Sequence, residues 1–201
     1  MLFSDTYLTV EQPAEALFKD KGSKFIGLAY PVQNEQQVKE ILQGLKKEHH
    51  TANHHCYAYR LGADKLAFRA SDDGEPSNTA GRPILGQIQS NDLTDILIVV
   101  VRYFGGTLLG VSGLIHAYKT TAAEVIKAAK IVEKQILFPY TIRFPFEQLN
   151  DVMKILKQSE AKITAQEFDN SCNISFHIRK ASSEACEEKL KKLEGLSLEY
   201  R

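Results

Sequence analysis

The chain has 201 residues, of which 43% are hydrophobic and 25% are charged, so it falls in the globular range and is long enough for one large domain or two small ones. Its 25 basic and 25 acidic residues balance, and they balance again on each side of Phe138, which excludes a general electrostatic attraction to nucleic acid or anionic membranes. The three cysteines, Cys56, Cys172 and Cys186, lie far apart without a CxxC pair, which argues against a disulfide framework and structural zinc.

The first predicted elements are two strands within residues 14–32. Glycine and short polar residues at positions 20–23 separate two β-rich runs there, as in a hairpin turn. Asn34 can then cap a helix that extends to about His49, because apolar residues recur at helical spacing. The elements that follow are strands at residues 56–61 and 65–70, a short helix within 79–89, a buried strand at 95–102, and a long helix from Ser112 to about Ala129.

Beyond Phe138 the predicted order changes to strand, helix, strand, strand, helix, strand. These elements occupy residues 140–144, 146–158, 162–168, 172–178, 183–193 and 196–200, with a turn at Asp169-Asn170 between the two middle strands. A βαββαβ order is typical of a ferredoxin-like domain. We therefore expect two domains, 1–137 and 138–201, with a short apolar boundary segment.

The N-terminal segment lacks a basic start followed by an apolar core, as a secretory signal would have. No apolar run approaches the ~20 residues that a membrane span needs. Together with the cysteine pattern, these features lead us to expect a cytoplasmic protein without a membrane partner.

A cluster of imidazole and thiol side chains, from His49 to Cys56, offers good ligands for zinc and related metals. If a strand begins at His54, however, His54 and Cys56 face one way and His55 and Tyr57 the other. The ligands then cannot converge, so no metal site is expected. His55 or His54 alone remains a candidate acid, base or hydrogen-bond donor.

Residues 71–78, with the sequence SDDGEPSN, form an acidic loop that follows a strand. Its three carboxylates and two hydroxyls suit a cation or the basic groups of a partner, whereas the structural interpretation is a solvated turn that caps a helix. Together with the Gly81-Arg82-Pro83 break, the segment is longer than a tight turn of about two to five residues. This length favours a binding loop.

Residues 102–113, with the sequence RYFGGTLLGVSG, form a glycine-rich loop between a buried strand and a helix. Glycines let backbone N–H groups approach a ligand, and a helix N-terminus favours an anion, although the same glycines can serve tight packing. The segment from Gly105 to Ser112 nearly spells the P-loop pattern, but Val111 stands where that pattern needs lysine. A conventional P-loop NTPase is therefore not expected, and no local nucleophile signature is present.

Four separated segments together resemble the Impact (YigZ) family. They are KGSKFI at 21–26, HHCYAYR at 54–60, SDDGEPS at 71–77 with TAGRP at 79–83, and VVRYFGG at 100–106. The resemblance covers roughly residues 21–129, and the remainder is similar to the small C-terminal domain that bacterial members carry. Where members often have lysine and arginine beside the glycine loop, this chain has Leu108 and His116. Losing two positive charges should weaken phosphate contacts.

The resemblance implies an α+β protein. Its N-terminal domain is expected to have the left-handed β-α-β arrangement shared by a ribosomal-protein domain and several small-molecule kinases. Its ferredoxin-like C-terminal domain is expected to be similar to the last domain of elongation factor G. Through these likenesses both domains point toward the translation apparatus. Eukaryotic members regulate translation by competing for the ribosome-associated activator of a stress-responsive initiation-factor kinase.

The leading hypothesis is a non-enzymatic, translation-linked binding protein that docks on a protein or ribonucleoprotein partner without a cofactor. The residues expected to bind this partner are His55, Arg60, Ser71, Asp72, Asp73, Glu75, Arg82, Arg102 and Tyr103. The alternative is an enzyme or binding protein for a phosphorylated or nucleotide-like small molecule, held by the backbone of the glycine-rich loop. Its expected anion-binding residues are Gly105, Gly106, Gly110, Ser112 and Gly113. RNA binding by the C-terminal domain is a third alternative, by analogy of fold.

Overall fold

The computed structural model describes residues 5–169 and 171–200, which divide into two compact units. The N-terminal unit comprises Tyr7–Lys134, and the C-terminal unit comprises residues 135–169 and 171–200 together with Asp5 and Thr6. The sequence placed the boundary after residue 137, inside what is now strand β8. Of the helices in these residues, none is both long and apolar enough to span a bilayer.

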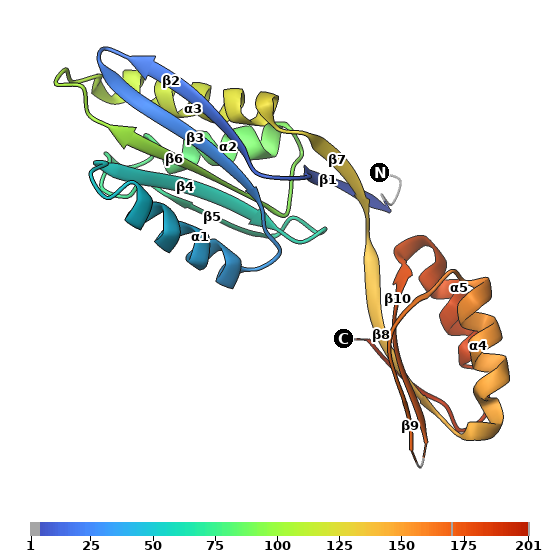
Figure 1. Ribbon diagram of the computed structural model, residues 1–201. Helices are drawn as coiled ribbons and strands as arrows, with labels where there is room; N and C mark the ends of the chain where they lie inside the picture. The colour runs from blue at the N-terminus through green and yellow to red at the C-terminus, as the bar shows by residue number, and fades with distance from the viewer. Residues whose placement is uncertain (1–4, 170, 201) are drawn as a thin grey trace. The chain divides into compact units, whose positions relative to one another are not determined.

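The chain up to Gln135 forms seven strands and three helices among its described residues (Figure 1). They are β1 (Thr6–Val10), β2 (Ala14–Asp20), β3 (Ser23–Pro31), α1 (Glu35–Glu48), β4 (His54–Leu61), β5 (Ala67–Ser71), α2 (Gly81–Ser90), β6 (Ile96–Tyr103), α3 (Gly110–Ala128) and β7 (Ile131–Gln135). The helices and strands predicted in this part are all present, and Asn34 caps α1 by accepting a hydrogen bond from the backbone N–H of Gln37.

A five-stranded sheet in the order β2-β3-β6-β4-β5 is the frame of the N-terminal unit. All four neighbouring pairs are antiparallel, so β3 and β4 run parallel to each other on either side of β6 and are joined by α1. This is the expected β-α-β arrangement. The central strand β6 is buried from Ile96 to Arg102 because the sheet has helices on both faces.

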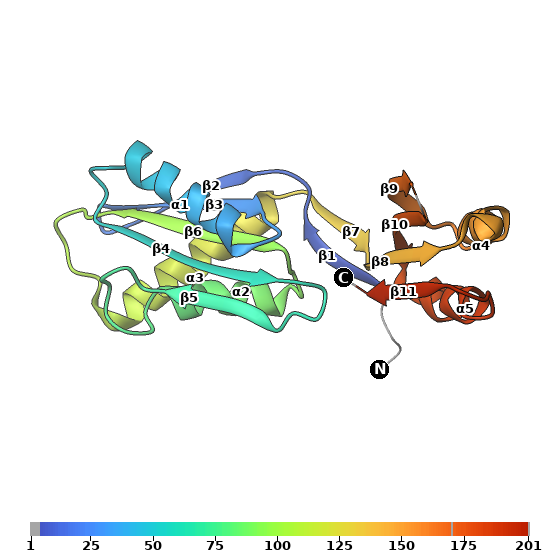
Figure 2. The same ribbon diagram turned by 90° about the horizontal axis from the view of Figure 1, so that it is seen from below.

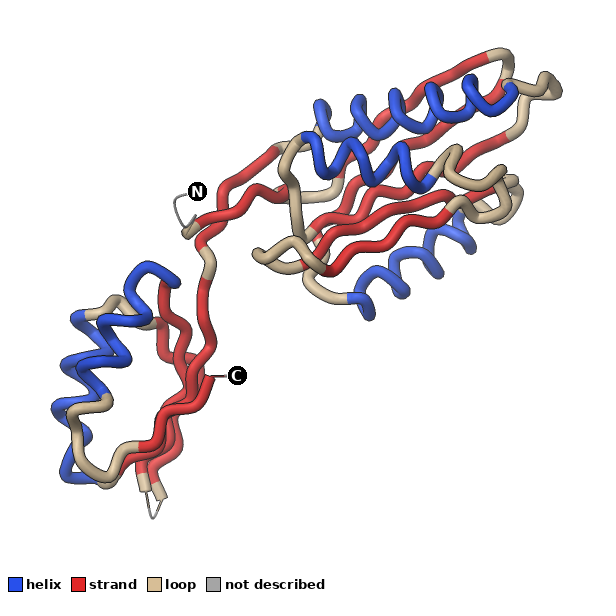
Figure 3. The backbone as a smooth tube through the Cα atoms, turned by 180° about the vertical axis from the view of Figure 1, so that it is seen from behind, coloured by secondary structure: helices blue, strands red, loops and turns tan. Residues whose placement is uncertain are grey.

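The two faces of this sheet carry different helices (Figure 3). Helices α2 and α3 pack on one face, against residues such as Phe25, Cys56 and Ile98. Helix α1 packs on the other, against residues such as Tyr59 and Val99. Because side chains alternate along a strand, β4 sends Cys56 toward α3 and its neighbours toward α1.

Two features of this unit differ from the sequence-based expectations. Strands β1 and β7, which pair with each other, were not predicted, because their pairing joins segments more than a hundred residues apart and has no local signal. Helix α3 begins at Gly110, whose φ is 72°, rather than at Ser112. Ser112 therefore lies within the first turn and is not the cap.

The C-terminal unit is a ferredoxin-like βαββαβ domain, as the sequence indicated. Its elements are β8 (Leu137–Phe144), the short 3₁₀ helix η1 (Phe146–Gln148), α4 (Leu149–Gln158), β9 (Lys162–Phe168), β10 (Cys172–Arg179), α5 (Lys180–Leu190) and β11 (Ser197–Tyr200). The sheet order is β11-β8-β10-β9, with β11 visible beside β8 in Figure 2. Alternate residues of β10, such as Ile174 and Phe176, form the core beneath both helices. Asn170 of the predicted turn lies outside the described residues.

Candidate functional site

A buried ion pair joins the acidic loop to the end of β6. Arg102 Nη1 donates to Glu75 Oε1 at 2.5 Å, and the two side chains are only 7% and 3% exposed. The rings of Phe25 and Phe104 lie 5.4 Å and 5.7 Å from the guanidinium carbon. These aromatic neighbours favour the cation electrostatically while shielding it from water. Such a pair is stable only when both charges are matched.

A tyrosine and a cysteine extend this pair into the core. The Tyr118 hydroxyl donates to Glu75 Oε1 at 2.7 Å, and Cys56 Sγ lies 3.3 Å from that hydroxyl and 3.0 Å from the carbonyl oxygen of Asp72. Burial raises the pKa of the Cys56 thiol and the pKa of the Tyr118 hydroxyl well above their ordinary values. Both groups are therefore neutral, and Cys56 lacks the thiolate character that a nucleophile needs.

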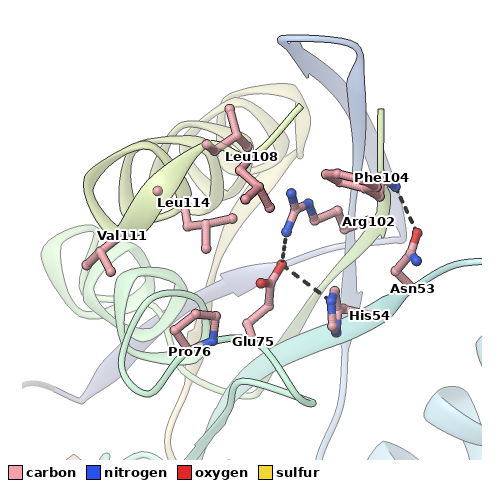
Figure 4. A pocket seen from close by; sticks show the side chains of 11 residues that line it. Asn53, His54, Glu75, Pro76, Arg102, Phe104, Leu108, Val111 and Leu114 are labelled. Carbon is pink, nitrogen blue, oxygen red and sulfur yellow. Dashed lines mark hydrogen bonds and ion pairs between the residues drawn. The ribbon is translucent and has the colours of Figure 1, made fainter. Parts of the chain in front are cut away.

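A pocket of about 430 Å³ opens above the ion pair (Figure 4). Its volume is in the range of small-molecule sites, which run from about 300 to 1,000 Å³. The residues that line it are Asn53, His54, Glu75, Pro76, Arg102, Phe104, Leu108, Leu109, Gly110, Val111 and Leu114. Its floor is thus an ion pair, while most of its walls are apolar.

The other two carboxylates of the acidic loop are used to build the loop. Asp72 accepts hydrogen bonds from the backbone N–H groups of Asn78, Ala80 and Gly81, at 2.8–3.0 Å, and so satisfies the start of α2. Asp73 Oδ2 accepts from the backbone N–H of His55 at 2.7 Å. Of the three carboxylates, Glu75 therefore faces the pocket.

The glycine-rich loop serves close packing at one position. A Cβ on Gly105 would lie 1.9 Å from the carbonyl carbon of Gly22, and the Gly105 N–H donates to Ser23 Oγ at 3.1 Å. The loop is therefore held against the β2–β3 turn. Gly106 has a φ of 87°, in the left-handed region that suits glycine. At Gly110 the loop reaches the pocket, where α3 begins without a hydrogen bond from a capping side chain.

Several residues expected to bind the partner lie away from the pocket. His55 is 7% exposed and turns toward α1, and its burial lowers its pKa. Tyr103 contacts His49 on the same face, with 2.9 Å between its hydroxyl and His49 Nδ1. Arg60 lies at the opposite end of β4, where it donates to the carbonyl of Leu93.

The remaining expected residues are placed as follows. Arg82 is exposed on α2, and Ser71 Oγ accepts from the N–H of Asp73 at 3.4 Å. Ser112 is exposed in the first turn of α3, while Gly113 packs within that helix against Leu109. The predicted set therefore does not form one cluster, and the pocket takes only Glu75, Arg102 and Gly110 from it.

The pocket also contains His54, which the sequence named as a candidate acid, base or hydrogen-bond donor, and apolar residues that the sequence-based prediction missed. His54 donates through Nδ1 to the carbonyl oxygen of Asp73 at 2.9 Å, which directs Nε2 toward Glu75, 3.9 Å away. Leu108 and Val111 line the mouth and are 82% and 59% exposed. The available signal was the presence of apolar residues in a loop that is otherwise polar.

The histidine-rich segment shows no metal-binding geometry. Within residues 5–169 and 171–200, no three His, Cys, Asp or Glu side chains are grouped so that they can hold an ion. Alternation along β4 separates His54 from His55, as the strand pattern predicted.

Comparison with known proteins matches residues 21–126 to the Impact N-terminal domain. The chain is 31% identical to IMPACT family member YvyE of Bacillus subtilis, over 91% of this chain and 84% of that protein. It is 32% identical to IMPACT family member YigZ of Escherichia coli, over 82% and 81% of the two chains. The protein IMPACT homolog of Saccharomyces cerevisiae is 32% identical over 54% of this chain and 43% of its own. A crystal structure described as that of a hypothetical protein aligns with a TM-score of 0.77 and 30% identity, covering 98% and 97% of the chains.

Proposed function

Since the chain belongs to the IMPACT family, we propose that it is a translation-linked regulatory protein that docks on a protein or ribonucleoprotein partner, such as a ribosomal particle. The docking face is the end of the N-terminal unit where the glycine-rich loop and the start of α3 surround the pocket. Family membership and the character of this face support the proposal; the fold alone would not specify a function.

The observation that carries the proposal is a group of exposed apolar side chains at the pocket mouth, here named the apolar rim. It consists of Phe104, Leu108, Val111 and Ile115, which are 44%, 82%, 59% and 38% exposed. Three of them line the pocket, and Ile115 lies one helical turn after Val111 on α3. Large apolar side chains gathered in this way are typical of a surface that a partner covers.

The charges near the rim favour a partner that presents protein surface over free nucleic acid. Leu108 and His116 stand where the family resemblance leads us to expect lysine and arginine, and the Arg102 guanidinium that lines the pocket is already paired with Glu75. Phosphate binding depends on unpaired cations, whereas an apolar rim gains from excluding water. We therefore place the contact on a protein component of the partner.

One observation supports the alternative of a phosphorylated small molecule. The first turn of α3 lines the pocket without a capping side chain, and such a terminus attracts anions. The negative charge of Glu75 opposes a dianion at the same place. A thermal-shift screen with nucleotides and sugar phosphates tests this alternative, because a ligand at ~100 times its Kd stabilises the folded state by about 2.7 kcal/mol.

Co-sedimentation with purified ribosomes and separated subunits tests docking. Val111→Asp places a charge in the apolar rim without disturbing the core, and Leu66→Asp is the matched control, because Leu66 is 77% exposed and lies outside the pocket. The wild type and Leu66→Asp should sediment with one of the particles, and Val111→Asp should remain in the supernatant. Absence of the wild type from every particle, or equal sedimentation of both variants, contradicts the proposal.

A further inference from the structure

The pocket floor offers hydrogen-bonding groups that the ion pair leaves unused. Arg102 uses Nη1 for Glu75, and Nε is buried without an acceptor among the described residues. No hydrogen bond from Nη2 or to Glu75 Oε2 is found there either. Figure 4 shows the Arg102 side chain pointing into the pocket and the second oxygen of Glu75 on the side of Leu114. A buried donor without a partner destabilises the folded protein, so a ligand that supplies the acceptor offsets this cost.

The unused groups form a donor edge next to an acceptor. The Nε and Nη2 edge of a guanidinium matches the two oxygens of a carboxylate. Glu75 Oε2, the second oxygen of the carboxylate that Arg102 Nη1 contacts, matches a positively charged N–H donor. A ligand that satisfies both therefore carries a carboxylate and an ammonium group close together.

The charge balance of the site favours such a ligand over a simple anion. Glu75 and Arg102 together carry no net charge, and the start of α3 adds roughly half a positive charge. A phosphate dianion would leave an excess of negative charge in a pocket where Leu108 and Val111 supply no cation. A zwitterion adds no net charge, so each of its groups is matched without a further counterion.

The walls define the remainder of the ligand. Pro76, Leu109, Val111 and Leu114 face the space above the ion pair, and Leu114 is buried while Val111 is at the mouth. An aliphatic or aromatic side group placed there would be removed from water, which favours binding in proportion to the apolar surface buried. A charged side group would lose its hydration without a partner.

From these features we propose that the pocket binds a free α-amino acid with an apolar side chain, such as leucine, isoleucine or phenylalanine. Arg102 holds the carboxylate, Glu75 holds the ammonium group, and the apolar walls hold the side chain. The ligand lies on the floor of the pocket and the apolar rim lies at its mouth, with Val111 belonging to both. Glu75→Gln and the leucine analogues therefore test this proposal apart from docking.

Isothermal titration calorimetry of the full chain with L-leucine tests the proposal. Saturable binding with one site per chain is expected. N-acetyl-leucine lacks the cation and leucinamide lacks the carboxylate, so each should bind at least ~10-fold more weakly, since a tenfold change corresponds to only about 1.4 kcal/mol. Equal binding of either analogue, or no binding of any apolar amino acid at millimolar concentration, overturns the proposal.

Two variants separate recognition from folding. Glu75→Gln keeps the shape of the side chain but removes the charge that holds the ammonium group, so leucine should bind at least ~10-fold more weakly and lose its advantage over N-acetyl-leucine. Val111→Asp, at an exposed position of the mouth, keeps the core intact and should also weaken leucine binding, because it places a charge against the apolar side chain of the ligand. Far-UV circular dichroism establishes that each variant is folded. Unchanged leucine affinity in a folded Val111→Asp protein, or in a folded Glu75→Gln protein, contradicts the assignment.

Discussion

Replacement of Arg102 by methionine should destabilise the N-terminal unit strongly. The substitution retains an apolar chain of similar length but leaves the Glu75 carboxylate, which is 3% exposed, without its cation. Removing one partner of a buried ion pair leaves the other charge desolvated and unpaired, and we expect this to lower the free energy of unfolding by ~3–5 kcal/mol. Tyr118 still donates to Glu75, so we expect the lower end of this range.

Urea unfolding of the full chain, followed by circular dichroism, measures this cost. With a denaturant dependence of about 2 kcal/mol per molar urea, a loss of ~3 kcal/mol moves the midpoint down by about 1.5 M. The two units can unfold in separate transitions, so the affected transition must be assigned. Ile174→Ala provides the assignment, because Ile174 is fully buried in the core of the C-terminal unit and should move the other transition.

The double variant Arg102→Met with Glu75→Gln tests the physical cause. An uncharged glutamine needs no cation, so the double variant should be more stable than Arg102→Met alone by at least ~1 kcal/mol. If Arg102→Met shifts the midpoint by less than ~0.5 M, or if the second substitution adds to the loss, charge pairing is not what makes this residue important.

Three further outcomes follow from particular contacts. Gly105→Ala should destabilise the protein by more than ~1 kcal/mol, since its Cβ would lie 1.9 Å from a backbone carbon, whereas Gly44→Ala should stabilise α1 by about 0.5–1 kcal/mol, since nothing lies within 4 Å of a Cβ there. Thermal unfolding in which both variants shift stability in the same direction would refute the packing argument. Asp72→Ala should cost about 1–3 kcal/mol and accelerate amide hydrogen exchange at Ala80 and Gly81, which lose their acceptor; unchanged exchange there would show that Asp72 does not hold the loop. Burial raises the pKa of Tyr59 to about 12, so its stabilising contribution is complete below pH 10.0 and is lost as the pH rises from 10.0 toward 12. In urea unfolding across this range Tyr59→Phe should lose less stability than the wild type, and an equal loss in both proteins would contradict the raised pKa.

Local patterns in the sequence were sufficient for most of the fold. The alternation and turn residues around Gly22 predicted the β2–β3 hairpin, and Asn34 with the apolar spacing beyond it predicted α1. The C-terminal βαββαβ order also followed from periodicity. Strands β1 and β7 were missed because what stabilises them is pairing between distant segments, which a single sequence does not display.

Local patterns were not sufficient for the candidate site. The sequence marked two unusual loops as the predicted binding face, but it could not indicate which of their polar groups form hydrogen bonds within the protein. Asp72 and Asp73 accept hydrogen bonds from backbone N–H groups, and Gly105 packs against the neighbouring turn. The loop residues with the strongest chemical character are therefore largely structural.

The sequence by itself thus determined the elements, the alternation that separates His54 from His55, and the family to which the chain is similar. Only the tertiary structure decided which side chains meet. The sheet order places the end of β6 beside the acidic loop and the start of α3, and this brings Arg102, Glu75 and Tyr118 together although up to 43 residues separate them in the chain. These three side chains come together because distant helices and strands pack against each other and because a buried charge needs an opposite charge beside it. Neither requirement can be read from the spacing of residues along the chain.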